Sequence, residues 1–115
     1  YGLEGLVSTR ADVYSFGIVM METVSRTKPS DQMFSGDLSL KKWIEDSLPN
    51  ATLHVIDGNL ISPEDENFTH KLECVVQIMK LALNCCRECP GERINMKDVV
   101  AEIKKIKHQL STKVG

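Results

Sequence analysis

The chain has 115 residues, 42% of them hydrophobic, which is enough for one folded unit and argues against several domains. Fourteen basic and sixteen acidic residues give a formal net charge of −2, so the basic balance typical of a nucleic-acid-binding protein is absent. The longest uninterrupted apolar stretch, residues 16–21, is far shorter than the roughly 20 residues that a membrane-spanning helix needs, so we expect no direct membrane insertion.

A first helix is predicted over residues 11–25. Thr9 and Asp12 have the spacing of a capping box at its start, where they would satisfy early backbone donors. The apolar residues of this segment are spread around its whole circumference. We therefore expect neighbours to cover it on several sides, as a central support of the core.

A second helix is predicted over residues 38–48, where apolar residues recur at helical spacing around Trp43 and Pro49 follows as a stop. Residues 53–61 hold Asp57-Gly58 between apolar residues, which is a recognised hairpin signal. Because the flanks do not alternate cleanly and a lone hairpin is marginal in water, we expect an irregular connector instead.

Two longer helices complete the chain, over residues 69–86 and 96–110. The third carries a narrow polar stripe, so we expect its neighbours to enclose most of it. The fourth starts after Asn95, a good N-cap, and should bury one face that includes Val100. Its last turns are rich in Lys, and positive charge there complements the carbonyl end of the helix dipole. The predicted fold is therefore all-α, with about four main helices.

Two segments carry a family resemblance. The first is Asp12-Val13-Tyr14-Ser15-Phe16-Gly17 with the apolar residues after it, and the second is Cys86-Arg87-Glu88-Cys89-Pro90-Gly91-Glu92-Arg93-Ile94-Asn95-Met96. In this order they resemble the start of the central helix of a protein kinase's large lobe and the family's C-x-x-x-P-x-x-R-P-[ST]-M segment. The residues between them are closest to plant leucine-rich-repeat receptor-like Ser/Thr kinases. The resemblance covers essentially all of residues 1–115 and implies the helical C-terminal part of the large lobe, without the small lobe, the catalytic loop or a transmembrane segment.

The resemblance assigns structural roles to four residues, Asp12, Phe16, Gly17 and Arg93. Asp12 matches an Asp that accepts hydrogen bonds from the backbone of the catalytic loop, although a first-turn acid also stabilises a helix N-terminus by itself. Arg93 matches an Arg that pairs with the Glu of the A-P-E motif. Because that Glu is not in this sequence, we expect Arg93 to turn to solvent or to a substitute acid such as Glu4 or Glu92.

The first residues of the chain match the stretch after A-P-E, next to the place where kinases dock peptide substrates. Possible substrate-docking residues are Tyr1, Gly2, Leu3 and Gly5. A free chain end is also prone to fraying, which is the simpler expectation for this segment.

The sequence lacks the kinase residues that carry the chemistry. No two glycines have the G-x-G spacing of a phosphate-covering loop, no His begins an H-R-D motif, and no Asp begins D-F-G. Phosphoryl transfer depends on positioning and charge neutralisation by these parts. We therefore predict no catalytic, cofactor-binding or metal-binding residue in this chain, with ATP and Mg²⁺ implied only for a complete kinase domain.

The resemblance thus implies part of a receptor-like Ser/Thr kinase that supplies scaffold and peptide-docking surface and is inactive alone. Its partners would be the remainder of the kinase domain and the parent's protein substrates, and the parent would lie at the cytoplasmic side of the plasma membrane. An alternative is a stand-alone, non-catalytic helical interaction module derived from a kinase. A third hypothesis is a thiol or zinc protein, based on Cys86-x-x-Cys89 and on His70 four residues before Cys74. Buried free thiols are the expectation we prefer, because no second C-x-x-C is present.

Overall fold

The computed structural model describes residues 10–34, 38–48 and 50–114. Four α-helices account for most of them: α2 (Arg10–Ser25), α3 (Leu40–Ser47), α4 (Phe68–Cys85) and α5 (Met96–Val114). Two short 3₁₀ helices, η1 (Thr52–His54) and η2 (Pro90–Glu92), lie in the connections. The described part of the chain contains no strand, so the all-α prediction is confirmed.

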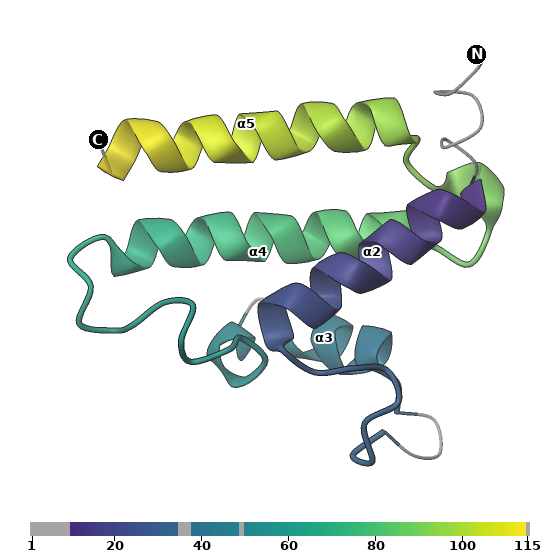
Figure 1. Ribbon diagram of the computed structural model, residues 1–115, viewed down its shortest axis with the longest axis horizontal. Coiled ribbons are helices and arrows are strands. Elements are labelled where there is room, and N and C mark those ends of the chain that lie inside the picture. The colour runs from purple at the N-terminus through teal and green to yellow at the C-terminus, as the bar shows by residue number, and fades with distance from the viewer. Residues whose placement is uncertain (1–9, 35–37, 49, 115) are drawn as a thin grey trace.

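The two longest helices, α4 and α5, lie side by side and run in opposite directions (Figure 1). α2 crosses α4 obliquely, and α3 lies on the far side of α2 from α5. α4 therefore occupies the middle of the fold, in contact with each of the other three helices. This position explains why its polar stripe is narrow.

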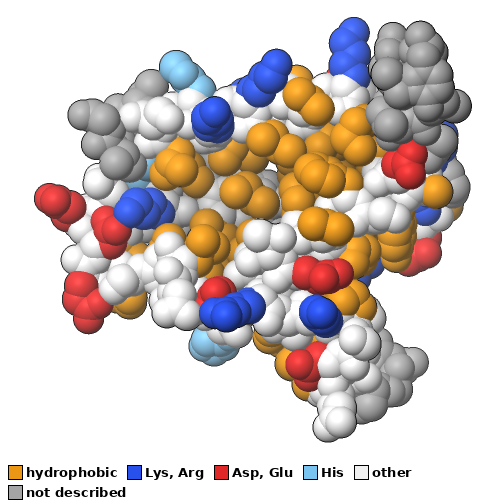
Figure 2. All heavy atoms as spheres, in the orientation of Figure 1, with side chains coloured by type: hydrophobic (Ala, Val, Ile, Leu, Met, Phe, Trp, Pro, Cys, Tyr) orange, Lys and Arg blue, Asp and Glu red, His pale blue; other side chains and the backbone are white. Residues whose placement is uncertain are grey.

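One hydrophobic core joins all four helices. Its most deeply buried side chains come from each helix and from the connection after η1: Val13, Met21, Leu40, Ile44, Val55, Met79, Cys85, Cys86 and Val99. Apolar side chains also gather across the middle of the face seen in Figure 2, over α4 and its boundaries with α2 and α5. Burial of the core side chains is the main force that holds the helices together.

Side-chain caps fix the starts of two helices. The backbone N–H of Asp98 donates to Asn95 Oδ1 at 2.8 Å, which confirms the predicted cap of α5. Ser39 Oγ accepts from the N–H of Lys42 at 3.1 Å, so α3 begins at Leu40 and not at Leu38. The predicted capping box at Thr9 lies outside the described residues.

The connection between α3 and α4 forms no hairpin over residues 50–67, which the structure describes. Its backbone instead makes successive tight turns, with N–H groups of His54 and Val55 donating to carbonyls three residues earlier. The N–H of Asp57 reaches Val24 O at 2.9 Å and ties the connection to the end of α2. The irregular connector predicted over residues 53–61 is therefore confirmed.

Two expectations about buried faces are wrong. Val100 on α5 is 44% exposed, because it lies about 100° around the helix from the fully buried Val99. α2 is covered on one side and not on several: Val13, Met20 and Met21 are buried, whereas Val19 is 53% exposed. Ser15 lies on the same open side as Val19 and is also exposed.

None of the helices in the described ranges combines the length and the apolar character that crossing a membrane requires.

Candidate functional site

The two motif segments that are far apart in the sequence meet at the end of the fold where α2 begins. The contact consists of the first half of α2 and the loop that follows α4, which we call the α4–α5 loop (residues 86–95). Three of the residues singled out by the sequence, Gly17, Phe16 and Arg93, take part in this junction or in the core beside it.

Gly17 allows the backbones of α2 and α4 to approach closely. A Cβ atom at this position would lie 2.6 Å from Cys86 Sγ, 2.7 Å from Cys85 Cβ and 2.8 Å from the carbonyl oxygen of Ala82. Real Cβ atoms essentially never come closer than 3.0 Å to such neighbours. Glycine is thus the only residue that fits this crossing without displacing a helix.

Buried thiols fill the other side of the crossing. The Cys86 thiol donates to the carbonyl oxygen of Tyr14 at 3.4 Å, which joins the end of α4 to α2. Burial raises the pKa of Cys85 and that of Cys86 to about 11. Both thiols therefore remain protonated at neutral pH and behave as small packing groups rather than nucleophiles.

Arg93 ties the α4–α5 loop to the first turn of α2. Its guanidinium donates to three backbone carbonyl oxygens, those of Arg87 (Nε, 2.6 Å), Arg10 (Nη1, 3.1 Å) and Glu88 (Nη2, 3.4 Å). The guanidinium carbon also lies 4.9 Å from the centre of the Tyr14 ring, in the range of a cation–π contact.

Arg93 was expected to turn to solvent or to a substitute acid such as Glu4 or Glu92, and of these alternatives the one with Glu92 is wrong. The Glu92 carboxylate lies 3.9 Å from Nη1 of Arg87 instead, and Glu4 lies outside the described residues. The physical reason is that a planar guanidinium has five N–H donors, and three of them donate here to backbone carbonyls without any carboxylate. No pattern in the sequence indicates these carbonyl partners.

The structure describes two of the remaining predicted site residues, Asp12 and Phe16. Asp12 is exposed in the first turn of α2, where an acid favours the helix N-terminus. Phe16 is half-buried and packs against the core. The possible docking residues Tyr1, Gly2, Leu3 and Gly5 lie outside the described residues.

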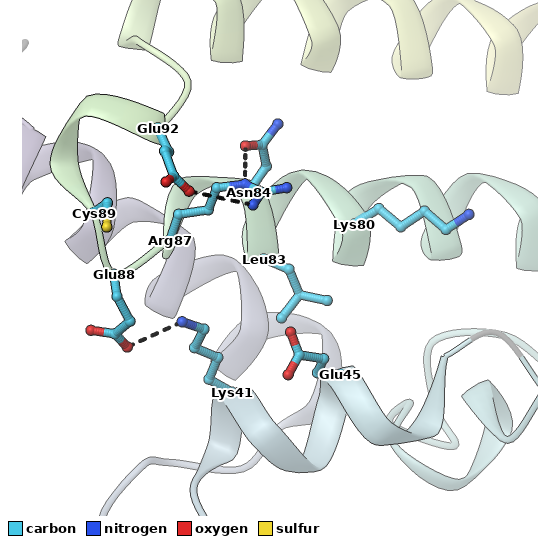
Figure 3. A pocket seen from close by; sticks show the side chains of 9 residues that line it. All are labelled: Lys41, Glu45, Lys80, Leu83, Asn84, Arg87, Glu88, Cys89 and Glu92. Carbon is cyan, nitrogen blue, oxygen red and sulfur yellow. Dashed lines mark hydrogen bonds and ion pairs between the residues drawn. The ribbon is translucent and has the colours of Figure 1, made fainter.

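Next to the junction lies a cavity of about 390 Å³ between α3, α4 and the α4–α5 loop. Figure 3 shows charged side chains of both signs around it, and several of them pair with one another. Lys41 Nζ donates to Cys86 O at 2.6 Å and to Glu88 Oε1 at 3.2 Å, so α3 is fastened to the end of α4. Sequence reasoning missed this role of Lys41, because its partners are more than 40 residues away in the chain.

The described residues do not fit Mg²⁺-ATP. They contain no group of three or more His, Cys, Asp or Glu side chains placed to hold a metal ion. In the charged cavity, the carboxylates of Glu88 and Glu92 already face Lys41 and Arg87. No step of phosphoryl transfer is therefore assigned to this chain.

The residues of the zinc hypothesis fall at opposite ends of α4: His70 and Cys74 lie near its start, whereas Cys86 and Cys89 follow its end. Cys86 is buried whereas Cys89 is exposed, and all four thiols are free. His70 Nε2 lies 2.8 Å from the carbonyl oxygen of Gln109 and 4.0 Å from Cys74 Sγ. This histidine therefore links the start of α4 to the end of α5, which is a structural contact.

Comparison with known proteins shows to which family this chain belongs. The sequence model described as protein tyrosine and serine/threonine kinase matches residues 3–103, which include both motif segments, and the chain belongs to this protein kinase family. Its curated relatives include the receptor kinase-like protein Xa21 of Oryza sativa subsp. japonica, 32% identical over 96% of this chain and 12% of that protein. The LRR receptor-like serine/threonine-protein kinase RGI1 of Arabidopsis thaliana is 30% identical over 95% of this chain and 9% of its own length. The chain thus spans about a tenth of the length of the relatives it matches.

Proposed function

We propose that this chain is the C-terminal helical part of the large lobe of a receptor-like Ser/Thr protein kinase. In the complete protein it serves as scaffold and as part of the peptide-docking surface, and alone it transfers no phosphate. The full domain binds ATP and Mg²⁺ and phosphorylates protein substrates at the cytoplasmic side of the plasma membrane. The match to the kinase family and the relatives' names as receptor-like kinases support this proposal.

The observation that carries the scaffold role is the junction around Gly17 and Arg93. A close crossing at Gly17 packs α2 against the end of α4, and one Arg93 hydrogen bond joins the α4–α5 loop to Arg10 O at the start of α2. The other two Arg93 hydrogen bonds hold the loop itself, at Arg87 O and Glu88 O. The opposite side of α2 stays open, with Ser15 and Val19 exposed. A helix that is held rigidly on one side and open on the other is suited to support a further part of the domain.

The proposal that the isolated chain is inactive rests on the catalytic motifs that its sequence lacks. The sequence has no G-x-G, no H-R-D and no D-F-G, and the described carboxylates form no metal cluster. Because catalysis of phosphoryl transfer is mainly positioning and electrostatic stabilisation, loss of all these groups removes the mechanism.

Titration calorimetry and radiolabel transfer test this directly. The purified chain should show no saturable binding of Mg²⁺-ATP and no transfer of phosphate to itself or to casein, with the RGI1 kinase domain as positive control. Saturable nucleotide binding, or label transfer that survives repurification, would contradict the proposal.

Sedimentation and hydrogen exchange separate the scaffold from the stand-alone interaction module. A scaffold without the rest of its kinase domain leaves one side of α2 exposed. It should therefore self-associate as its concentration rises, and the amides of α2 should exchange faster than those of α4. A concentration-independent monomer with strong protection throughout residues 12–24 would favour the stand-alone module.

The docking role of the first residues is tested in a chimera. In it, this chain replaces the matching segment of the RGI1 kinase domain. Replacing Leu3 and Gly5 by Asp in the chimera should raise KM for a peptide substrate more than it lowers kcat, because ground-state contacts are lost. An unchanged KM would remove the docking role and leave the scaffold role standing.

A further inference from the structure

The exposed side of α5 is rich in basic residues. Lys97, Lys104, Lys105, Lys107 and His108 are all exposed, and we call them together the α5 basic face. At 100° per residue, Lys97, Lys104 and His108 fall within about 20° of one line along the helix, and the other two lysines flank that line. Figure 2 shows basic side chains and a histidine along the edge formed by α5, with most acidic side chains of that view elsewhere.

These charges lack acidic partners on their own helix. Among the residues that the structure describes, the ion pairs use basic side chains from other elements and none from α5. The only acids of α5 are Asp98 and Glu102, and both precede Lys104. The positive charge of the face is therefore available to a partner.

The helix dipole does not account for this surface. The sequence predicts a helix that ends at Leu110, which would put the lysines in its last turns, but α5 continues to Val114. Lys104, Lys105 and Lys107 thus lie about two turns before the end, whereas the effect of the dipole fades beyond the last turn.

The form of the face indicates what kind of partner it fits. From Lys97 to His108 it extends for about 16 Å along the helix, at 1.5 Å per residue. Two cavities beside α5 are lined from that helix by Glu102, Ile106 and Leu110 and not by these lysines. The ammonium group of lysine acts as a hydrated point charge, whereas the planar guanidinium of arginine can donate two parallel hydrogen bonds to one carboxylate or phosphate. An extended lysine surface without a groove suits a diffuse anionic surface better than a specific peptide.

We propose that the α5 basic face binds the anionic headgroups of a lipid bilayer. The contact is electrostatic and does not insert the helix, because the apolar side of α5, with Val99 and Ile106, is already buried in the core. Clusters of four or more lysines at a membrane surface are typical of binding to anionic lipids. The inference agrees with the receptor-like parent proposed above but does not depend on it.

Co-sedimentation with lipid vesicles tests the proposal. The probes are vesicles of equimolar phosphatidylcholine and phosphatidylserine, with pure phosphatidylcholine as reference, at low and high salt. The chain should bind only the anionic vesicles, and salt should weaken the binding because it screens the lysines over about 10 Å at 0.1 M. The variant K104Q/K105Q/K107Q should bind roughly 100-fold more weakly, since each lysine near the surface contributes about fivefold.

The matched control is K28Q/K42Q/K80Q, which neutralises three exposed lysines that lie outside α5. Both variants change the formal net charge from −2 to −5, so only the position of the lost charge differs. The control should keep its binding within about twofold, because these lysines lie off the face and are screened. Circular dichroism should show that both variants remain helical.

Three results would overturn the proposal. The first is equal binding to neutral and anionic vesicles, and the second is equal loss in the two variants. The third is binding to soluble polyglutamate without binding to vesicles, which would assign the face to an acidic polypeptide.

Discussion

Replacing Gly17 by Ala should destabilise the fold, although alanine is the better helix former. In a helix interior, Ala is favoured over Gly by about 1 kcal/mol. Against this, the new methyl group would meet Cys86 Sγ, Cys85 Cβ and the carbonyl oxygen of Ala82 at 2.6–2.8 Å. A backbone oxygen cannot move without its helix, so the cost of overpacking should reach or exceed the upper end of the usual range of about 1–3 kcal/mol. We expect a net loss of about 2 kcal/mol in the free energy of unfolding.

Urea denaturation followed by circular dichroism measures this loss. The control is Gly58→Ala, since a Cβ at Gly58 would have no atom within 4 Å. It should change the free energy of unfolding by no more than about 1 kcal/mol, with stabilisation the more natural direction. If Gly17→Ala were as stable as the unmodified chain or more stable, the close crossing of α2 and α4 would be wrong.

Three further predictions follow from burial and backbone geometry. Met21→Ala should lower the free energy of unfolding, measured by urea denaturation, by about 2–5 kcal/mol, because Met21 is fully buried. Lys42→Ala on the surface should change it by about 0.5 kcal/mol at most. Effects of similar size in the two variants would contradict the assigned core. Arg26→Gly should stabilise the fold by about 1 kcal/mol and raise Tm. The reason is that Arg26 has φ 56°, a left-handed backbone conformation that is less favourable for other residues than for glycine. A lower Tm would mean that the ion pair between Arg26 and Asp57 contributes more than this backbone cost. Ellman's reagent should modify Cys89 first, because the other three thiols are buried, and a second equally fast thiol would refute that arrangement.

Much of the fold could be predicted from local patterns. The four helices appear within a few residues of their expected bounds, because hydrophobic periodicity and the Asn95 cap are local signals. The end of α5 was missed by four residues, since no glycine or proline stops the helix before Val114. The exposure of Val100 and Val19 depends on which side of each helix meets α4, and periodicity alone does not decide this.

The sequence was sufficient to predict which residues form the candidate site, but not which atoms they contact. The motif resemblance singled out Gly17 and Arg93, and the structure brings both to the junction of α2 with the α4–α5 loop. The reason that Gly17 is glycine, and the choice of carbonyl partners by Arg93, depend on the distance between two crossing helices. The same holds for the hydrogen bond from Lys41 to Cys86 O. Such distances are set by tertiary packing, which leaves no local signal in the sequence.

The most direct test of the scaffold role measures phosphate transfer by the RGI1 chimera, in which this chain replaces the matching segment of the kinase domain. The chimera should fold and phosphorylate a substrate protein that the unmodified RGI1 domain also phosphorylates. Arg93→Ala in the chimera should lower that rate by weakening the junction, and Arg93→Lys should restore little, because an ammonium group cannot replace the planar fork. A chimera that unfolds cooperatively, like the RGI1 domain, but transfers no phosphate would contradict the assignment of this chain as a kinase scaffold.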